Sequence, residues 1–344
     1  MTDRPSAGPL SLVTGAAGFI GSHLVERLLA AGRHVRGVDS FTGYYDPQLK
    51  RANLGQALAH PRFEMVAADI THSETDALVA GAETIFHLAG QPGVSDSWTK
   101  FPDYVQGNVV STQRLLEAAR RAGVGRFVLA SSSSVYGDTV EDPSQEDDPV
   151  APLSPYGLTK VSAEALCSLY ASEWKVPTVA LRYFTVYGPR QRPDMAIHRL
   201  IRGVLEGRPF TLRGDGTQQR AFTYVDDVVD ATLAAAATDI EAGTSINVGA
   251  ARCVSLTEVM ELVEQLSGQV LRLDLREAEP GAVHRTAACT DRARQLLGWE
   301  PQTTLLRGIE KQLSWQEASA SAPARRGQSL LHARRRLEEI AHAP

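Results

Sequence analysis

Several features are scarce or missing in this sequence. No apolar run approaches the roughly 18–20 residues of a membrane-spanning helix. The start, Met1–Ser6, has no apolar signal-peptide core, so we expect a cytoplasmic protein without a membrane partner. The only cysteines, Cys167, Cys253 and Cys289, are far apart and lack metal-ligand spacing. We therefore expect reduced thiols of structural role and no metal site.

An excess of positive charge is also missing. The 344 residues contain 35 Lys and Arg against 40 Asp and Glu, a formal net charge of −5. This balance gives no support for nucleic acid or an anionic membrane as a partner, so any anion-binding site must be local. With 43% hydrophobic and 22% charged residues, the chain has the composition of a soluble globular protein of one large or two modest domains.

A glycine-rich turn stands near the start of the chain. A short apolar run, Leu10–Thr14, is followed by Gly15–Gly21 (Gly-Ala-Ala-Gly-Phe-Ile-Gly) and then by apolar residues at helical spacing, Ile20, Leu24 and Leu28. This pattern predicts strand, tight turn and helix, in which glycines let the backbone approach a pyrophosphate at a helix N-terminus. Alone, three glycines also fit an ordinary turn.

Asp39 strengthens the nucleotide interpretation. It ends the predicted strand His34–Val38 and lies 18 residues beyond Gly21. A carboxylate there can bind the hydroxyls of an adenosine ribose and repels a 2′-phosphate, which favours NAD over NADP. The alternative is a solvated aspartate at a strand end.

Four further strands are predicted, and polar or small residues follow them. Asp69 and Ile70 would lie near an adenine, Ala89–Gly90 would let a cofactor pass, and His87, inside an apolar run, is expected to be packed rather than catalytic. Hydroxyls cluster at Ser131–Ser134, where open α/β sheets place ligands. The predicted strands are Phe63–Asp69, Thr84–Ala89, Arg126–Ser131 and Thr178–Phe184.

Two long helices are predicted in the first half, one over about Tyr104–Arg121. The second begins with Ser154 as its cap and Pro155 at its first position. On it, Tyr156 and Lys160 are four residues apart and share a face. Tyrosine ordinarily titrates near pH 10. A neighbouring ammonium and a bound nicotinamide would stabilise the phenolate, so that Tyr156 can act as a base at neutral pH.

The overall pattern predicts a doubly wound parallel α/β sheet with a smaller α/β C-terminal region. We expect a Rossmann domain over 1–185, a mainly substrate-binding region over 186–317 with some later segments returning to the sheet, and a linker with a possible helix over 318–344. Helical and strand patterns of the later part lie near Ala196–Glu206, Asp226–Ala237, Ser245–Val248, Leu256–Leu266 and Leu330–Ile340.

The glycine turn, the serine cluster and Tyr-x-x-x-Lys, in this order, resemble the extended short-chain dehydrogenase/reductase family, in particular its nucleotide-sugar epimerases and dehydratases. The resemblance runs from about Leu10 to Trp315. It implies NAD as cofactor, held by the residues Gly15, Gly18, Phe19, Ile20, Gly21, Asp39, Asp69, Ile70, Leu88, Ala89, Gly90, Ser131, Tyr156, Lys160 and Tyr183.

The serine cluster narrows the reaction within that family. Counted back from Val135-Tyr136-Gly137, the family's catalytic Ser or Thr is Ser132, beside Tyr156 and Lys160. Dehydratases of the family carry Asp-Glu before this Val, and its decarboxylases carry Glu there. Here the two positions are Ser133 and Ser134, which are candidate substrate contacts or structural caps, so the resemblance favours epimerisation.

The sugar is indicated by other motifs that resemble UDP-glucuronate 4-epimerases, namely Asp39–Asp46, Gly90–Val94 and above all Arg182–Ala196 (Arg-Tyr-Phe-Thr-Val-Tyr-Gly-Pro-Arg-Gln-Arg-Pro-Asp-Met-Ala). By this resemblance, Thr185 and Arg192 hold the sugar and its carboxylate. A fixed guanidinium suits a carboxylate better than a CH₂OH group.

The diphosphate contacts match the family less well. Arg220 matches an arginine on the UDP pyrophosphate, although Ala221 stands where the family has Asp. Glu279 and Ala282 replace an expected Arg and Asp, so Arg276 or Arg285 is a candidate substitute.

The resemblance implies that Tyr156 takes the O4 proton, C4 gives hydride to NAD, and the 4-keto sugar rotates before hydride returns. The alternatives are a 4-epimerase of a neutral UDP-hexose and an NAD-binding sensor without catalysis. The presence of Tyr156 and Lys160 disfavours the sensor. A homodimer through the helices after Phe101 and from Tyr156 is also implied.

Overall fold

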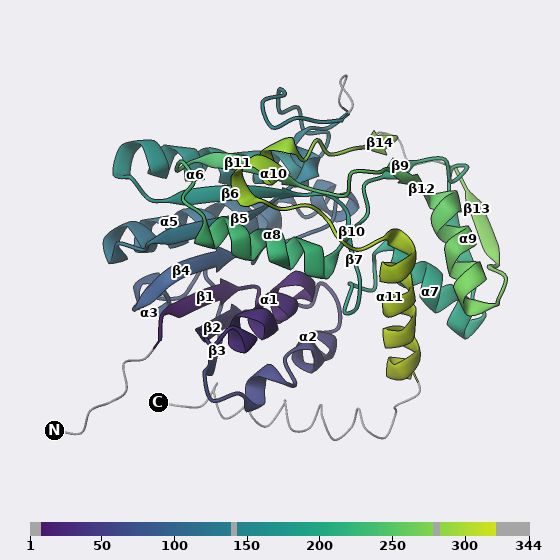
Figure 1. Ribbon diagram of the computed structural model, residues 1–344, viewed down its shortest axis with the longest axis horizontal. Coiled ribbons are helices and arrows are strands. Elements are labelled where there is room, and N and C mark those ends of the chain that lie inside the picture. Colours follow the sequence, from purple (N-terminus) through teal and green to yellow (C-terminus); the bar gives the residue numbers. More distant parts are fainter. Residues whose placement is uncertain (1–7, 139–142, 278–282, 321–344) are drawn as a thin grey trace.

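A seven-stranded parallel sheet forms the centre of the structure, a computed structural model that describes residues 8–138, 143–277 and 283–320 (Figure 1). All neighbouring strands pair in parallel. From β1, the strands β2 and β3 follow toward one edge of the sheet, and β4, β5 and β6 follow toward the other edge. This reversal of strand order beside β1 confirms the doubly wound fold. Across the sheet the strands are β11 (Thr244–Val248), β6 (Thr178–Tyr183), β5 (Arg126–Ser132), β4 (Ala82–His87), β1 (Leu10–Thr14), β2 (His34–Asp39) and β3 (Phe63–Ala67).

Helices cover both faces of this sheet. α1 (Phe19–Ala30) and α8 (Val225–Ala237) bury their apolar residues in one hydrophobic cluster and pack against each other (Figure 1). α3 (Thr75–Val79), α5 (Ser111–Ala122) and α6 (Pro155–Trp174) contribute to a second cluster. Strands buried on both faces read as continuous apolar runs rather than alternating ones, which is the pattern of the predicted strands.

A smaller lobe lies beyond the carboxyl ends of β6 and β11. Its longer helices are α7 (Ala196–Glu206), α9 (Leu256–Ser267) and α11 (Leu305–Ala320). Its short strands form the pairs β7 (Val186–Tyr187) with β10 (Thr223–Tyr224) and β8 (Phe210–Arg213) with β13 (Leu273–Arg276), and the group β12 (Val254–Ser255), β9 (Gln219–Arg220) and β14 (Arg285–Thr286). The short helices of the chain are α2 (Pro47–Asn53), η1 (Ala57–Ala59), η2 (Ser95–Trp98), η4 (Ser133–Val135) and α10 (Asp291–Leu297).

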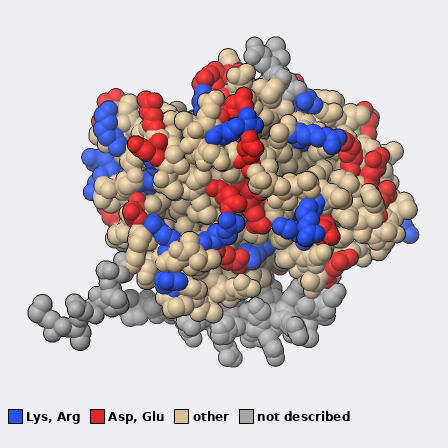
Figure 2. Space-filling view, viewed as in Figure 1, with Lys and Arg blue, Asp and Glu red and all other residues tan. Residues whose placement is uncertain are grey.

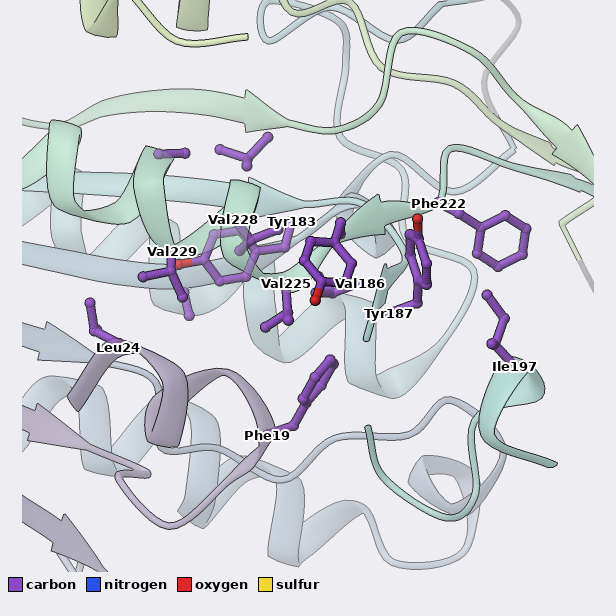
Figure 3. Packing of buried hydrophobic residues seen from close by; sticks show 14 of the residues in the cluster. Phe19, Leu24, Tyr183, Val186, Tyr187, Ile197, Phe222, Val225, Val228 and Val229 are labelled. Carbon is purple, nitrogen blue, oxygen red and sulfur yellow. The ribbon is translucent and has the colours of Figure 1, made fainter. Parts of the chain in front are cut away.

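One hydrophobic cluster joins the sheet to the smaller lobe. It includes Phe19 of α1, Tyr183 of β6, Tyr187 of β7, Ile197 of α7 and Phe222 (Figure 3). The predicted boundary between residues 185 and 186 falls inside this cluster, between two of its tyrosines. The two predicted regions therefore share one core.

The long helix expected over about 104–121 is interrupted. α4 (Phe101–Tyr104) continues into a π-helical segment, η3 (Val105–Val110), before α5 begins at Ser111. The Ser111 and Thr112 hydroxyls donate to the carbonyls four residues earlier, at 2.6 Å each. Such bonds compete with regular helix geometry, and π segments often occur at functional sites.

Several predicted elements end at other residues. The third strand stops at Ala67 rather than Asp69, because the Asp69 carboxylate accepts the Thr71 N–H at 2.8 Å and turns the chain. Helix α11 continues to Ala320, so the predicted linker begins inside it. Residues 321–344, with the predicted helix Leu330–Ile340, lie outside the described residues.

The surface carries both charges. Lys and Arg alternate with Asp and Glu on the face drawn in Figure 2, as on an ordinary solvated surface. None of the three cysteines, all of which lie in the described ranges, forms a disulfide. In the part of the chain that the structure describes, no helix is long and apolar enough to cross a membrane and no cluster of His, Cys, Asp and Glu could hold a metal.

Candidate active site

The predicted site residues meet at one edge of the sheet. Gly15 follows β1, Asp39 ends β2, Leu88 follows β4, Ser132 ends β5 and Thr185 lies just after β6. Because the strands are parallel, these carboxyl ends lie at the same edge, which is where doubly wound sheets bind ligands.

The glycine turn leaves no room for side chains. Gly15 has φ +68°, and a Cβ there would lie 2.8 Å from the Ala89 nitrogen. A Cβ on Gly21 would overlap the Gly15 carbonyl oxygen. Gly18 caps α1 without a side-chain hydrogen bond, so first-turn amides remain available to an anion. This geometry fits a pyrophosphate held by backbone.

Asp39 is held in place at the end of β2. Its two carboxylate oxygens accept N–H groups from Ala17 at 3.1 Å and Phe41 at 2.8 Å, and the Lys50 Nζ lies 3.4 Å from Oδ1. The residue is buried. Each carboxylate oxygen has two acceptor positions, so a ribose hydroxyl can still bind there.

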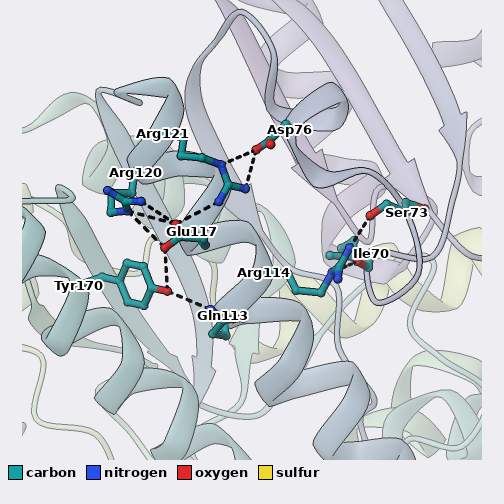
Figure 4. Close-up of polar contacts among 9 residues, drawn as sticks. All are labelled: Ile70, Ser73, Asp76, Gln113, Arg114, Glu117, Arg120, Arg121 and Tyr170. Atoms are coloured by element: carbon teal, nitrogen blue, oxygen red, sulfur yellow. Dashed lines mark hydrogen bonds and ion pairs between the residues drawn. The ribbon is translucent and has the colours of Figure 1, made fainter.

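The loop that carries Asp69 and Ile70 is fastened from α5. The Arg114 guanidinium donates to the carbonyls of Ile70 at 3.0 Å and Ser73 at 2.6 Å (Figure 4). Burial acts to raise the pKa of Asp69, but hydrogen bonds from Thr71 outweigh it and lower that pKa. The predicted adenine loop is thus rigid, with Asp69 ionised at neutral pH.

The predicted catalytic residues lie on α6 and at the end of β5. Lys160 is buried; its ammonium donates to the Ala130 carbonyl at 2.9 Å and lies 5.9 Å from the centre of the Tyr156 ring. Ser154 caps α6 as predicted, its Oγ accepting the Gly157 N–H at 3.1 Å. The Ser132 hydroxyl donates to Ser134 Oγ at 3.1 Å, and Ser133 begins η4. A phenol beside an ammonium at a strand's carboxyl end can exchange a proton with a bound hydroxyl.

Asn108 is a candidate site residue that the sequence analysis missed. It is buried in the π segment. Its side-chain amide bonds the backbone of Gln91: Oδ1 accepts the Gln91 N–H at 2.7 Å, and Nδ2 donates to the Gln91 carbonyl at 3.1 Å. Nδ2 also donates to Thr159 Oγ1 at 2.9 Å. A Cβ on Gly90 would lie 2.7 Å from Asn108 Oδ1 and 3.5 Å from Lys160 Nζ. The long helix predicted over about 104–121 contains several other polar residues, and nothing in the sequence singles out Asn108 among them.

Arg192 lies in a second cluster that the sequence analysis recognised only in part. Its Nε and Nη2 donate to the two oxygens of Asp194, each at 3.0 Å, and its guanidinium lies 5.7 Å from the centre of the Tyr44 ring. Burial acts to lower the pKa of Arg192, but the pairing with Asp194 and the nearby Tyr44 and Tyr156 hydroxyls raise it above its usual value. A Cβ on the neighbouring Gly93 would overlap the Tyr44 hydroxyl and lie 3.3 Å from the Tyr104 hydroxyl, and the Tyr104 ring packs against Tyr156 at 6.2 Å, so Arg192 and Tyr156 belong to one cluster. Tyr44 and Asp194 are contacts that residue spacing did not reveal.

The side chains of two predicted cofactor residues form hydrogen bonds with other residues of the chain. Ser131 donates a hydrogen bond to Glu164, which also pairs with the buried Arg182. Tyr183 is buried in the shared core and its hydroxyl bonds Thr232 Oγ1 at 2.7 Å (Figure 3). For both residues, the backbone is the group left to approach a ligand.

The predicted diphosphate arginines lie on the small sheets. Arg220 donates to the carbonyls of Val283 at 2.7 Å and His284 at 3.1 Å, and burial lowers its pKa. Arg285 hydrogen-bonds Gln219 across the β9–β14 pair. Arg276 is exposed on β13, paired with Asp274. Glu279 and Ala282 lie outside the described residues.

His87 is packed, as expected from its apolar surroundings. It is buried, with Nδ1 2.8 Å from Thr14 Oγ1 and Nε2 3.0 Å from Thr112 Oγ1. Burial and the nearby Lys160 charge lower its pKa to about 3. His87 is therefore neutral at physiological pH and links β1, β4 and α5 beneath the site.

Comparison with known proteins agrees with this geometry. Over 306 residues, 88% of this chain and 96% of the relative, the chain is 42% identical to the uncharacterized UDP-glucose epimerase YtcB of Bacillus subtilis. It is 38% identical over 312 residues, 88% of this chain and 95% of the relative, to a UDP-glucuronate 4-epimerase of Thermodesulfobacterium geofontis. The crystal structure of the UDP-glucuronic acid 4-epimerase from Bacillus cereus, with UDP-glucuronic acid and NAD, superimposes with a TM-score of 0.87 at 42% identity, covering 90% of this chain and 99% of that one. Residues 11–249 match the family described as the NAD dependent epimerase/dehydratase family. The chain belongs to this NAD-dependent epimerase/dehydratase family.

Proposed function

We propose that this chain converts UDP-glucuronate and UDP-galacturonate into each other by epimerisation at C4. Its family and relatives support the broader activity, that of an NAD-dependent nucleotide-sugar epimerase. The proposal for the sugar rests on one observation, the cluster that links Arg192 to Tyr156 through Tyr44 and Tyr104: the Arg192 guanidinium lies 5.7 Å from the Tyr44 ring, and the Tyr104 ring lies 6.2 Å from the Tyr156 ring. Identity alone does not choose the sugar, because relatives named for glucose and for glucuronate match at 42% and 38%.

The residues present fit NAD. The backbone of the Gly15–Gly21 turn would hold the pyrophosphate, and the Asp39 carboxylate would bind the adenosine ribose hydroxyls and disfavour a 2′-phosphate. Gly90 lies beside Lys160, and a Cβ there would be 3.5 Å from the ammonium, an ordinary contact, but only 2.7 Å from Asn108 Oδ1, which is too close. When bound, NAD accepts hydride from the sugar and returns it.

The remaining steps belong to side chains. We assign Tyr156 as the base that takes the O4 proton and later returns it to the epimer. The Lys160 ammonium lies 5.9 Å from the centre of the Tyr156 ring and is oriented by the Ala130 carbonyl. Ser132 would bond the same sugar oxygen and help to move the proton. Ser133 and Ser134 are hydroxyls rather than the carboxylic acids that an elimination needs, so no water is expected to leave, and the Glu that the family's decarboxylases carry is absent.

Arg192 would recognise the C6 carboxylate, with Thr185 beside it on the segment after β6. Thr185 is tied down through its carbonyl, which accepts the Thr223 N–H at 2.9 Å. A 4-keto uronate is a β-keto acid that loses CO₂ when its carboxylate bond aligns with the carbonyl π system. A fixed guanidinium would hold the carboxylate out of that alignment.

Product analysis tests this proposal. Purified protein is incubated separately with UDP-glucuronate and UDP-glucose, and the products are separated and identified by mass and NMR. We expect efficient conversion of UDP-glucuronate to UDP-galacturonate. Equal or better conversion of UDP-glucose would overturn the assignment in favour of a neutral-hexose 4-epimerase.

The Arg192→Ala variant sharpens that test. We expect loss of at least about tenfold in kcat/KM for UDP-glucuronate and the appearance of a UDP-pentose. Arg202→Ala, which removes an exposed pair with Glu206 on α7, is the matched control. Unchanged turnover without UDP-pentose would contradict the role of Arg192.

We also propose a homodimer through α5 and α6. Helix α6 exposes Leu158 and Leu169 at 49% each. They lie on one face of the helix, and this face is the one that a second copy would cover. On the neighbouring α5, Glu117 receives hydrogen bonds from Arg120, Arg121 and Tyr170 (Figure 4). Light scattering that gives the mass of a single chain would refute the dimer.

A further inference from the structure

The pairing of Arg192 with Asp194 uses one particular edge of the guanidinium. Nε and Nη2, the side-on pair of donors, bind the two carboxylate oxygens at 3.0 Å each. A guanidinium has five N–H donors in a fixed plane. The end-on pair, Nη1 and the second hydrogen of Nη2, is not used by Asp194, and Nη1 has no hydrogen-bond partner among the residues described.

Further contacts fix the plane of this guanidinium. The Tyr44 ring lies 5.7 Å from it, and the Tyr44 hydroxyl donates to Asp194 Oδ2 at 3.4 Å. Tyr44 in turn fits against Gly93, which has φ +100° and where a Cβ would overlap the Tyr44 hydroxyl. Three separate loops, carrying Tyr44, Gly93 and Arg192, thus hold one arginine in one orientation.

Asp194 sits at the solvent side of this arrangement. Its side chain is 41% exposed, whereas that of Arg192 is 21% exposed. The nearby tyrosines lie on the sheet side, where the Tyr104 and Tyr156 rings make an edge-to-face contact at 6.2 Å. A carboxylate on the outer edge of a guanidinium orients it without occupying the edge that remains.

We propose that Asp194 is a positioning residue that selects uronates over neutral hexoses. It holds the side-on edge of Arg192 so that the end-on edge can receive the C6 carboxylate in a second bidentate pair. The inference rests on the proposed function. It differs from a simple competition, in which Asp194 would occupy Arg192 until substrate displaces it.

Kinetics on two sugars test this inference. The variants Asp194→Ala, Asp194→Asn and Asp194→Glu are assayed as full-length enzyme with NAD, on UDP-glucuronate and on UDP-glucose. We expect Asp194→Ala and Asp194→Asn to lower kcat/KM for UDP-glucuronate by about tenfold to a hundredfold, the range for one charge-assisted hydrogen bond. UDP-glucose should change by less than about threefold. Asp194→Glu, which keeps the carboxylate, should recover part of the loss.

A second readout distinguishes orientation from folding. A loosely held carboxylate can align with the keto group, so Asp194→Asn should release UDP-pentose, detected by mass. Asp96→Asn is the control, because it removes a nearby charge that pairs with Lys100 rather than with Arg192. Thermal unfolding of each variant checks the fold, and if Asp194→Ala does not fold, the Asn and Glu variants decide.

Three outcomes would overturn the inference: equal loss on both sugars, no loss on either, or a lower KM for UDP-glucuronate in Asp194→Asn, which is the signature of competition. The proposed function fails separately, when the wild-type chain itself prefers UDP-glucose. In that case the selectivity assigned to Asp194 fails with it.

Discussion

The two halves of the candidate site are built by different means. On the cofactor side, the backbone shapes the site. Gly15 and Gly21 have no room for a Cβ, and the backbone amides of Ala17 and Phe41 hold the Asp39 carboxylate. On the substrate side, long side chains on loops are held by other side chains, as Arg192 is by Asp194.

This difference explains which half can vary. A backbone cradle fails as soon as a side chain enters it, whereas a loop arginine can be replaced while the sheet stays intact. One fold can therefore keep its cofactor and change its sugar, which is how function varies on a common scaffold. The following substitutions test this contrast, beginning with the largest expected effect.

Tyr156→Phe should remove the chemistry while both halves stay folded. Removing a general base costs about 10²–10⁴-fold in rate, and we expect kcat to fall by about a thousandfold. Tyr156 packs edge-to-face on Tyr104, and phenylalanine keeps that ring contact, so the melting temperature should change little. Turnover measured by product separation is the check. A Tyr156→Phe enzyme that still interconverts substrate at the wild-type rate would overturn the catalytic assignment.

The same contrast explains which site residues can be predicted from the sequence. Gly15, Asp39, Tyr156 and Lys160 could be predicted because local spacing along strand, turn and helix dictates where they lie. Asn108 could not, because its role depends on a π segment meeting a distant loop.

Long-range pairings were equally hidden. Nothing in the spacing of the chain says that Tyr44 meets Asp194, or that Ser131 turns its hydroxyl to Glu164. Strand ends also depend on side-chain turns such as that of Asp69. Residues that are placed by local spacing along a strand, turn or helix are visible in a sequence, and residues that are placed by long-range contacts need the fold.

Gly21→Ala breaks the cofactor half alone. The new Cβ would overlap the Gly15 carbonyl oxygen, which is backbone and cannot rotate away. Overpacking of this kind costs about 1–3 kcal/mol of unfolding free energy, and NAD affinity should fall with it. Urea unfolding and NAD titration measure both effects. Gly8→Ala is the control, because neither glycine has a positive φ and a Cβ on Gly8 would meet nothing closer than the His34 side chain at 3.7 Å. Retained NAD affinity in Gly21→Ala would contradict the backbone cradle.

His87 predicts how the cofactor half responds to acid. Its folded pKa of about 3 lies below the usual 6.5, so between these values the unfolded chain binds the proton and the folded chain does not. Stability should therefore fall as pH drops below 6.5, by about 1 kcal/mol per pH unit from this group. Urea unfolding at pH 7 and pH 5 should show a smaller pH dependence in His87→Gln than in the wild type. Equal pH dependence would show that His87 does not cause the loss.

Tyr45→Phe tests the boundary between the two halves with the smallest effect. Within the described part of the chain, the buried Tyr45 hydroxyl has no hydrogen-bond partner. The Tyr45 ring lies 5.4 Å from Lys50 Nζ, which pairs with Asp39 at 3.4 Å. Burial raises the pKa of Tyr45, as does the Asp39 charge, while the Arg192 charge acts in the opposite direction. An unpaired buried hydroxyl costs free energy, and its removal should leave the ligand-free chain as stable or slightly more stable.

If a ligand oxygen forms a hydrogen bond with the Tyr45 hydroxyl, removing this hydroxyl should weaken ligand binding. We expect KM for UDP-glucuronate to rise by about threefold to tenfold in Tyr45→Phe, a typical loss for one neutral hydrogen bond, with kcat nearly unchanged. Tyr44→Phe is the matched comparison, because its hydroxyl already has Asp194 as a partner and its loss should act on kcat as well. Thermal unfolding with and without UDP-glucuronate separates the effects. A Tyr45→Phe chain that loses stability without ligand would show that the hydroxyl serves the fold rather than the ligand.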